Sequence, residues 1–581
     1  MCSPASCGSP MSASGRTPGT RAAASGRSGT AVHPGTAVAV VGGGIAGLVA
    51  ARELALGGAR VTLLEREAVL GGRIRAATLA GTTFDVGAEA FATRGGAVAE
   101  LIAELGIAER VVHPAPAGAW VVTDAGSLPL PPGGAVGIPA RPMAASVRKH
   151  LGTGGALRAA LEPLLPRERD VADSTTIAEL VRRRAGARVL DRLVRPVTLG
   201  VYSAEPERLP LSAVPGLRAA YARTGSLVRA ARDLRDANVA AGGAVASLAG
   251  GMIALVDALA ADLDRLGVTV RTGVDVAVLA AARDNGAAAG VPAVAEWELR
   301  DGSDAVLARS AAVVLAVPEP VACALLSSAG PAAAAAAAAA ARPPSQHDIE
   351  VIAIAIADAR LDTAPRGTGA LVAPGAGIAA KALTHVTAKW PDRAARVAQG
   401  THVLRLSYGR AGLPPETAAL DDRGALALAC ADASRILGLG LGNGHGSGLA
   451  TRDGDGKGRG IDPDQVLDSV RQRWSVGAPP GPQPRLRAPS GIALVGDWVS
   501  GTGLASVIPG ARAAAATLLG RRGPAAPATA TSAAEPAAAA APVTSAAPAT
   551  AAAHPVPLAT EATTAPHAAP LTNPESPVSP A

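Results

Sequence analysis

A short apolar run, a group of glycines and a helical pattern follow one another near the start of the chain. Residues 37–41, AVAVV, form a valine-rich run typical of a buried strand. Residues 45–56 carry apolar positions at helical spacing and end at Gly57-Gly58, and residues 61–64 form a second buried run. The pattern predicts a strand, a helix and a second strand that lies parallel to the first.

The turn after the first strand has the spacing G-x-G-x-x-G. We expect Gly42 to make the tight turn, Gly44 to admit a diphosphate to the backbone, and Gly47 to let the helix pack closely on the strand. The N–H groups at the start of a helix also favour an anion. Glu65 lies 23 residues after Gly42, where its carboxylate can accept hydrogen bonds from ribose hydroxyls. The unit therefore predicts a dinucleotide site.

The rest of the hydrophobic pattern alternates between strand-like and helix-like segments. It predicts helices at 97–105, within 145–190, after Ser247, at 425–437 and at 511–519, and strands within 120–142, at 268–271, 312–317, 349–358 and 492–496. Strands that alternate with helices in this way indicate the α/β class. The ten alanines at 332–341 favour a helix, but so uniform a run offers no specific core packing.

Both ends of the 581-residue chain differ in composition from its middle. Residues 1–36 are mostly Ser, Gly, Pro, Ala and Thr, and residues 521–581 are mostly Ala, Pro and Thr with almost no large apolar side chain. Such segments bury too little surface to offset the entropy of ordering, so we expect both to be disordered. The acid-free N-terminus could also be an organelle transit peptide, but the small-residue bias of the whole chain favours a plain extension.

Charge and cysteine content argue against several classes of protein. The net charge of +7 is spread over the chain without a basic stripe, which argues against nucleic acid as a partner. Prolines interrupt the longest apolar region, 311–341, so no membrane span is expected. Four cysteines give neither a disulfide framework nor a zinc pattern. We therefore expect a cytoplasmic protein without a bound metal, which could in addition contact a membrane peripherally.

Four motifs taken together resemble the start of a known flavoprotein superfamily. They are GGGIAG at 42–47, Glu65, GGR at 71–73 and DVGAE at 85–89. In this arrangement they are similar to the FAD-binding region of the amine oxidase and protoporphyrinogen oxidase superfamily, so the resemblance implies FAD as the cofactor. Residues 195–217 resemble, more narrowly, the bacterial protoporphyrinogen and coproporphyrinogen oxidases.

The resemblance also implies where FAD would be held. A backbone amide at Val274 would face the adenine, and Gly501–Leu504 would lie at the N1/C2 carbonyl edge of the flavin, where a positive helix end stabilises negative charge. Residues 381–390 and 401–410 resemble the paired strands of the family near the flavin. The implied cofactor-binding residues are Gly42, Gly43, Gly44, Ile45, Ala46, Gly47, Glu65, Arg66, Gly72, Arg73, Gly87, Ala88, Glu89, Ala90, Val274, Asp497, Gly501, Thr502, Gly503 and Leu504.

Arg94 is the candidate ligand for the substrate. Its guanidinium follows the flavin-contacting turn and could hold a substrate carboxylate in bidentate fashion; a solvated arginine is the alternative. Lys389 could lie near flavin N5 or on a sheet surface, and Trp390 could be a core residue. No side chain stands out as an obligatory acid or base, so the catalytic residues are left unassigned.

The expected fold class is α/β (α+β), with a Rossmann-like FAD-binding domain, a mixed-sheet substrate domain and a helical insertion. The expected FAD-binding domain comprises residues 37–95, 240–320 and 488–520. The expected substrate domain comprises residues 96–239 and 321–487, with the helical insertion at about 140–235.

The resemblance implies an FAD-dependent, oxygen-using, six-electron oxidation of coproporphyrinogen III to coproporphyrin III in haem biosynthesis. Protoporphyrinogen IX is the alternative substrate. A carotenoid-type desaturase or an amine oxidase is a second hypothesis. A third is a homologue that binds FAD without catalysis, because residues 475–490 lack the Pro-Gln-Tyr and Gly-His elements that the family carries before its last strand.

Overall fold

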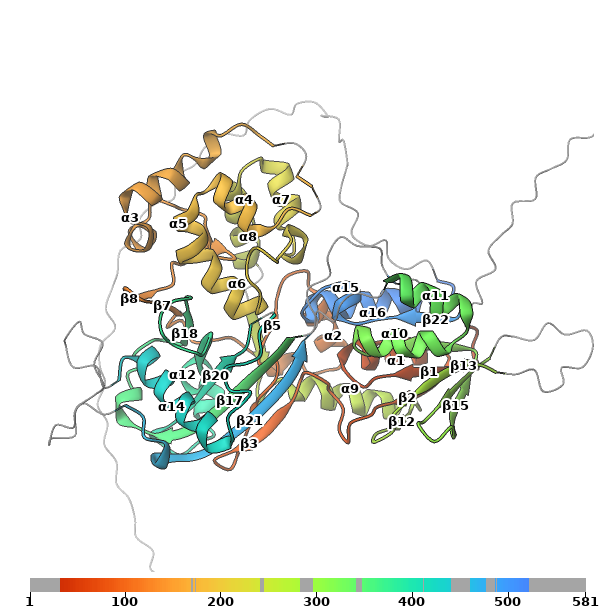
Figure 1. Ribbon diagram of the computed structural model, residues 1–581. Helices are drawn as coiled ribbons and strands as arrows, with labels where there is room; N and C mark the ends of the chain where they lie inside the picture. Colours follow the sequence, from red (N-terminus) through yellow and green to blue (C-terminus); the bar gives the residue numbers. More distant parts are fainter. Residues whose placement is uncertain are drawn as a thin grey trace, which may run out of the picture. The chain divides into compact units, whose positions relative to one another are not determined.

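Figure 1 shows a computed structural model of the chain. The structure describes residues 32–168, 171–172, 174–240, 245–282, 296–340, 347–410, 412–439, 460–476, 486 and 488–521. Most of both tails and most of the segment 475–490 lie outside these residues. The disorder expected of the tails therefore stays a prediction. So does the hypothesis, based on the segment before the last strand, that the chain binds FAD without catalysis.

A five-stranded parallel sheet forms the first half of the architecture. In spatial order its strands are β12 (Thr269–Arg271), β2 (Arg60–Leu64), β1 (Ala37–Val41), β16 (Ala312–Leu315) and β22 (Ile492–Leu494). All five were predicted from apolar runs, which parallel strands need because both faces of the sheet are covered. Strand β2 begins one residue earlier than expected, and β16 ends two residues earlier.

Helices cover one face of this sheet, and a helix with a small sheet covers the other (Figure 1). Helices α1 (Ile45–Leu56), α9 (Ile253–Arg265) and α16 (Leu504–Leu518) share a core cluster with Val38 and Val40. The opposite face, with Ala39 and Val41, packs against α10 (Glu319–Ser328) and the sheet of β13 (Val278–Ala281), β14 (Trp297–Arg300) and β15 (Val306–Ser310). Successive residues of β1 thus face opposite layers, as strand geometry requires.

The last helix is longer than the sequence predicts. Helix α16 begins at Leu504 and not at Ala511, and it contains Pro509 in its second turn. A proline removes a backbone donor and normally ends or kinks a helix. Here Ile508 and Ala511, on either side of it, are buried in the cluster that α16 shares with α1, so packing outweighs the local cost.

The second half is a mixed, seven-stranded sheet. Its order is β21 (Val466–Val476), β17 (His347–Ala357), β20 (Thr401–Tyr408), β19 (Ala382–His385), β18 (Gly369–Val372), β7 (Trp120–Thr123) and β8 (Gly126–Pro129). Strands β18 and β7 pair in parallel, and the other neighbours are antiparallel. Helix α14 (Asp422–Leu437) packs on one face. The strand expected over 381–390 ends at His385, because the chain turns there into the short helix α12 (Val386–Lys389).

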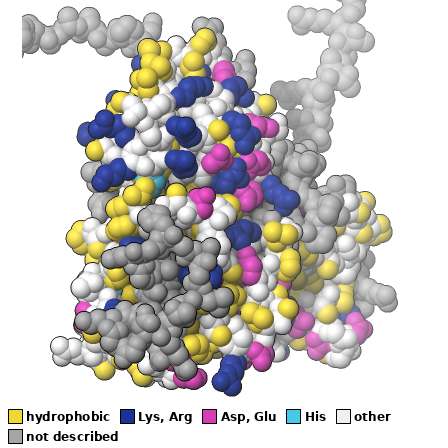
Figure 2. All heavy atoms as spheres, turned by 60° about the vertical axis from the view of Figure 1, so that its left-hand side comes forward, with side chains coloured by type: hydrophobic (Ala, Val, Ile, Leu, Met, Phe, Trp, Pro, Cys, Tyr) yellow, Lys and Arg dark blue, Asp and Glu magenta, His cyan; other side chains and the backbone are white. Residues whose placement is uncertain are grey.

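A helical unit occupies residues 145–240. It contains α3 (Ala145–Ala160), α4 (Ile177–Arg184), α5 (Ala187–Val189), α6 (Arg195–Tyr202), α7 (Leu217–Thr224) and α8 (Leu227–Ala240). Glu162 is fully buried there, and its carboxylate accepts hydrogen bonds from Arg184 and from the N–H groups of Leu227 and Val228 at the start of α8. One side chain thus balances a guanidinium and satisfies a helix start. In Figure 2, Lys and Arg side chains are dense over the upper part of the face shown.

The remaining elements are short or connect the two sheets. They are β3 (Ala76–Leu79), β4 (Thr82–Asp85), β5 (Phe91–Ala92), α2 (Ala97–Glu104), β6 (Val111–Val112), β9 (Gly134–Ala135), β10 (Ile138–Pro139), β11 (Val245–Leu248), α11 (Pro331–Ala340), α13 (Pro391–Ala394) and α15 (Asp497–Ser500). Ala337 on α11 is buried in the core beside α10, so the alanine run packs more specifically than expected. None of the helices in the described ranges is long and apolar enough to cross a membrane. The α/β class is confirmed, whereas the domain boundaries stay a prediction.

Candidate functional site

The three glycines of the first turn meet three different steric demands. Gly42 has φ of +104°, and a Cβ atom there would overlap the Ala316 carbonyl oxygen. A Cβ on Gly47 would overlap the Gly42 carbonyl oxygen and approach the Ala316 side chain to 3.1 Å. A Cβ on Gly44 would meet nothing closer than 4.0 Å, where it would face Gly72. Gly42 and Gly47 are therefore needed for packing, whereas Gly44 borders open space.

The start of α1 lies beside a second glycine turn. The Gly71 N–H donates to the Gly43 carbonyl oxygen at 2.9 Å, and a Cβ on Gly72 would lie 3.2 Å from the Gly44 Cα. The helix N-cap, Gly44, offers no side chain, and the first turn of α1 carries no acidic residue. Backbone N–H groups at a helix start attract an anion. The two glycine turns therefore contact each other, and the start of α1 beside them can attract an anion such as a diphosphate.

Glu65 lies close to this turn, as its position in the sequence predicts. Its carboxylate accepts hydrogen bonds from the Gly43 N–H at 2.5 Å and from the Glu67 N–H at 2.7 Å. The Val274 N–H donates to the Glu65 carbonyl oxygen at 2.9 Å. The amide that the resemblance assigns to an adenine is thus already engaged with the backbone of β2. The Arg66 side chain is 64% exposed and pairs with Glu67 at 3.4 Å, so it points to solvent.

The turn after β4 is held against the GGR turn by backbone contacts. The Ala88 N–H donates to the Arg73 carbonyl oxygen at 3.0 Å, and a Cβ on Gly87 would overlap that same oxygen. Asp85, just before the turn, accepts hydrogen bonds from the Met252 N–H at 2.9 Å and from Arg393 at 3.0 Å. This turn is therefore fixed on both sides.

Glu89 is the centre of a charged cluster that the sequence does not reveal. Its carboxylate pairs with Lys389 and with Arg405 Nη1 at 3.1 Å, and Arg405 Nη2 donates to the Gly87 carbonyl oxygen at 2.5 Å. Burial by itself raises the pKa of Glu89, but Lys389 and Arg405 outweigh it and lower the pKa to about 2. The carboxylate stays ionised, and it joins the glycine turn to β20 of the second sheet.

The structure contradicts one of the two sequence interpretations of Lys389. Its ammonium neutralises Glu89 at the end of α12, so Lys389 does not lie free on a sheet surface. Its position near flavin N5 stays a prediction. Trp390 is fully buried, as one of the alternatives expected, and its ring lies beneath Arg393 at 4.8 Å. The sequence gives no sign of a role for Arg393 or Arg405. Only their contacts with Asp85 and Glu89 in the structure identify them as residues of this site.

The last glycine segment leads directly into α16. Gly503 is the N-cap of α16 with φ of +86°, and a Cβ there would meet nothing within 4 Å. Gly501 also has a positive φ, of +97°, and Thr502 lies between the two glycines. Asp497 pairs with Arg73 of the GGR turn at 2.7 Å, so segments separated by more than 400 residues lie together. A second open helix start thus lies at the same site.

Arg94 lies within electrostatic range of Tyr202, the last residue of α6. Burial raises the pKa of the Tyr202 hydroxyl, and the positive charge of Arg94 opposes that rise. The sequence singled out Arg94, whereas Tyr202 belongs to the stretch 195–217 that resembles the porphyrinogen oxidases, and the fold brings the two into the same region. An anionic ligand at Arg94 would therefore lie beside the stretch 195–217.

Comparison with known proteins assigns the class. The family model described as flavin containing amine oxidoreductase matches residues 45–518, and the chain belongs to this family. Coproporphyrinogen III oxidase of Mycobacterium leprae is 32% identical over 403 residues, which cover 68% of this chain and 82% of that protein. Coproporphyrinogen III oxidase of Mycobacterium tuberculosis is 31% identical, with coverages of 69% and 82%.

Solved structures share the fold. A protein from Exiguobacterium sp. 255-15, provisionally named a protoporphyrinogen oxidase, superposes with a TM-score of 0.63 at 21% identity and covers 84% of this chain and 99% of its own. A putrescine oxidase bound to putrescine gives a TM-score of 0.53 at 16% identity, with coverages of 84% and 100%. The protein is thus an FAD-dependent oxidoreductase, and the glycine turns described above fit that cofactor.

Proposed function

We propose that the chain is a coproporphyrinogen III oxidase that uses dioxygen as the acceptor. The substrate is proposed because the chain matches proteins of that name over 82% of their length. We assign one substrate propionate to Arg94, whose charge acts on the nearby Tyr202 hydroxyl. Protoporphyrinogen IX is the second candidate, since a mitochondrial protoporphyrinogen oxidase of Nicotiana tabacum is 30% identical over 196 residues.

We assign the binding roles to residues on three glycine segments. Gly42–Gly47 and Gly72–Arg73 would hold the diphosphate, Glu65 the ribose, and Gly87–Ala90 with Gly501–Leu504 the flavin ring. When bound, FAD supplies the oxidising chemistry by accepting a hydride. The chain would bind and orient the substrate and exclude water from it. The open start of α16 would favour negative charge at the nearby ring edge.

The test begins with the absorbance of the purified protein, which should show bound flavin. Anaerobic mixing with coproporphyrinogen III should bleach that absorbance, and admission of air should produce porphyrin fluorescence together with hydrogen peroxide. Protoporphyrinogen IX, mixed in the same way, gives the comparison of substrates. A flavin that stays oxidised with both porphyrinogens would overturn the proposal and favour an FAD-binding homologue without this activity.

We extend the proposal to a peripheral contact between the helical unit and a membrane. Leu157, Leu161 and Leu164 are 50%, 47% and 78% exposed at and after the end of α3, and Arg148 and Lys149 are exposed in the part of α3 before its kink at Gly152. Exposed leucines beside basic side chains suit the surface of anionic lipids. Co-sedimentation with anionic vesicles tests this contact, with Leu157→Ser/Leu161→Ser as the variant. Equal sedimentation of the variant and the wild type would contradict it.

A further inference from the structure

Lys381 is a buried cation with two neutral hydrogen-bond acceptors. It directly precedes β19 and is 1% exposed. Its Nζ donates to Ser203 Oγ at 2.7 Å and to the Gly409 carbonyl oxygen at 2.8 Å. Burial penalises an ammonium unless a counter-charge compensates it. Neither of these acceptors supplies a negative charge.

The charges around Lys381 leave a positive excess. Arg410 is paired with Glu416, and Arg405 is paired with Glu89. Burial lowers the pKa of Lys381 to about 7; Arg410 and Arg405 lower it too, whereas Glu416 opposes them. Arg410 therefore has a carboxylate partner, whereas Arg405 shares Glu89 with Lys389, so the positive excess of this group includes the charge of Lys381.

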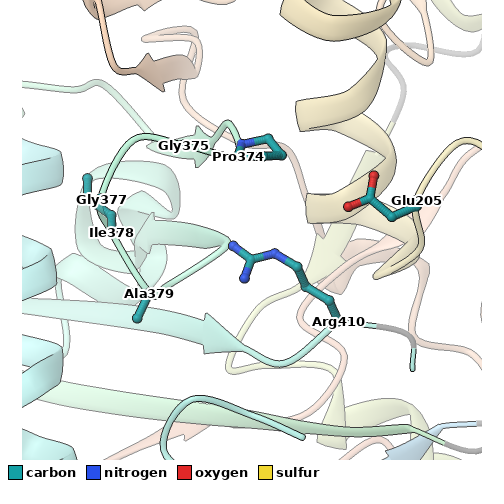
Figure 3. Close-up of a pocket in the computed structure, with 7 residues that line it drawn as sticks. All are labelled: Glu205, Pro374, Gly375, Gly377, Ile378, Ala379 and Arg410. Carbon is teal, nitrogen blue, oxygen red and sulfur yellow. The ribbon is translucent and has the colours of Figure 1, made fainter. Parts of the chain in front are cut away.

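An open depression of about 550 Å³ lies next to this cation. Its walls are the loop 374–379, Glu205 and Arg410, and Figure 3 shows the Arg410 guanidinium extending toward that loop. The two acceptors of Lys381 are close in sequence to residues of these walls, since Ser203 is two residues from Glu205 and Gly409 precedes Arg410. Lys381 therefore ties together the segments that form the depression.

Two segments connect this depression with the residues assigned to the substrate and the flavin. Ser203 follows Tyr202, which interacts with Arg94. Along β20, Arg405 contacts the Gly87 turn, and Arg410 comes five residues later, or about 15 Å along extended chain. A tetrapyrrole carries its propionates on different pyrrole rings, so a carboxylate bound at Arg94 leaves others free to bind elsewhere.

We propose that the depression binds one propionate carboxylate of the substrate, with Arg410 as its contact and Lys381 as the buried positioning residue. The proposal rests on the proposed function and adds a determinant of specificity to it. Coproporphyrinogen III carries two propionates more than protoporphyrinogen IX, so a second cationic subsite favours the first substrate. The Glu205 carboxylate opposes an anion there; Arg195 pairs with it at 2.6 Å but also pairs with Glu207 and Asp191.

Binding of the stable products tests the subsite without turnover. The dissociation constants of coproporphyrin III and protoporphyrin IX are measured by fluorescence on the FAD-loaded protein. Arg410→Gln should weaken the binding of coproporphyrin III by about 10- to 100-fold, because a charged hydrogen bond is lost. It should weaken the binding of protoporphyrin IX by much less. Arg410→Lys should restore part of the affinity. Arg423→Gln removes a cation from the exposed face of α14 and serves as the matched control.

Glu205→Gln distinguishes a lost contact from a damaged fold, because it should tighten coproporphyrin III binding. A destabilised protein cannot produce that gain. The affinity of the wild type should also fall as the pH rises through about 7, since the ammonium of Lys381 then loses its proton. Lys381→Met should abolish this dependence while flavin absorbance is retained.

The outcomes separate the subsite from the proposed function. Unchanged coproporphyrin III binding in Arg410→Gln, or an equal loss for both porphyrins, would overturn the subsite while the proposed function stands. If the wild-type holoprotein binds neither porphyrin, the proposed function fails and the subsite fails with it. A pH dependence that persists in Lys381→Met would remove that lysine from the subsite.

Discussion

The glycine turns around α1 and the charged cluster around Glu89 hold the same region of the molecule by different means. In the first, Gly42 and Gly47 act through the absence of a side chain, and their neighbours are a few residues away or on the adjacent strand. In the second, Lys389 and Arg405 reach Glu89 from 300 and 316 residues away. The glycine turns depend on steric fit, whereas the cluster depends on charge balance. Their variants should therefore fail in different ways.

The largest effect is expected at Gly47. Its added Cβ in Gly47→Ala would overlap the Gly42 carbonyl oxygen, which should lower the free energy of unfolding by about 4 kcal/mol and abolish FAD binding. Gly44→Ala is the matched control, because its Cβ would meet nothing closer than 4.0 Å. It should unfold like the wild type and still lose FAD, because the methyl group enters the space assigned to the diphosphate. Denaturant unfolding of the apoprotein and flavin content give both results.

The next effect is expected at Glu89. Glu89→Gln leaves Lys389 and Arg405 without their counter-charge and should lower the free energy of unfolding by about 3 kcal/mol near neutral pH. The pKa of Glu89 is lowered from 4.5 to about 2, so its stabilisation is complete above about 4.5 and is lost as the pH falls toward 2. The difference between the variant and the wild type should shrink over that range. Glu100→Gln, at an exposed glutamate, is the control.

A smaller effect, confined to the substrate, is expected at Arg94. Arg94→Ala should raise KM for coproporphyrinogen III by about 30-fold, because one charged hydrogen-bonding group is lost. Flavin content should not change, since the glycine turns remain intact. Steady-state kinetics in air and the absorbance of the holoprotein measure the two quantities. If the variant has the KM of the wild type, Arg94 does not take part in substrate binding.

The smallest effect is expected at Thr176, whose contact is local and belongs to neither the glycine turns nor the Glu89 cluster. Thr176 caps α4 by accepting a hydrogen bond from the Glu179 N–H, and the Glu179 carboxylate accepts one from the Thr176 N–H. Thr176→Ala should cost about 1 kcal/mol of unfolding free energy. Flavin content and KM should stay at their wild-type values. A change in either would show that the helical unit is coupled to the site more strongly than these contacts imply.

The sequence by itself determined the strand–helix–strand unit and the α/β class, because the apolar runs, the glycines and the helical pattern follow one another along the chain. It assigned Gly42 to a tight turn and Gly47 to close packing, and the structure adds the distant Ala316 as a neighbour of both. The sequence also singled out Arg94. Only the tertiary structure showed that Arg405 and Lys389 meet Glu89, that the Val274 amide is engaged by Glu65, and that α16 continues through Pro509. These features arise from strand register and helix packing between distant segments, which no local pattern of residues encodes.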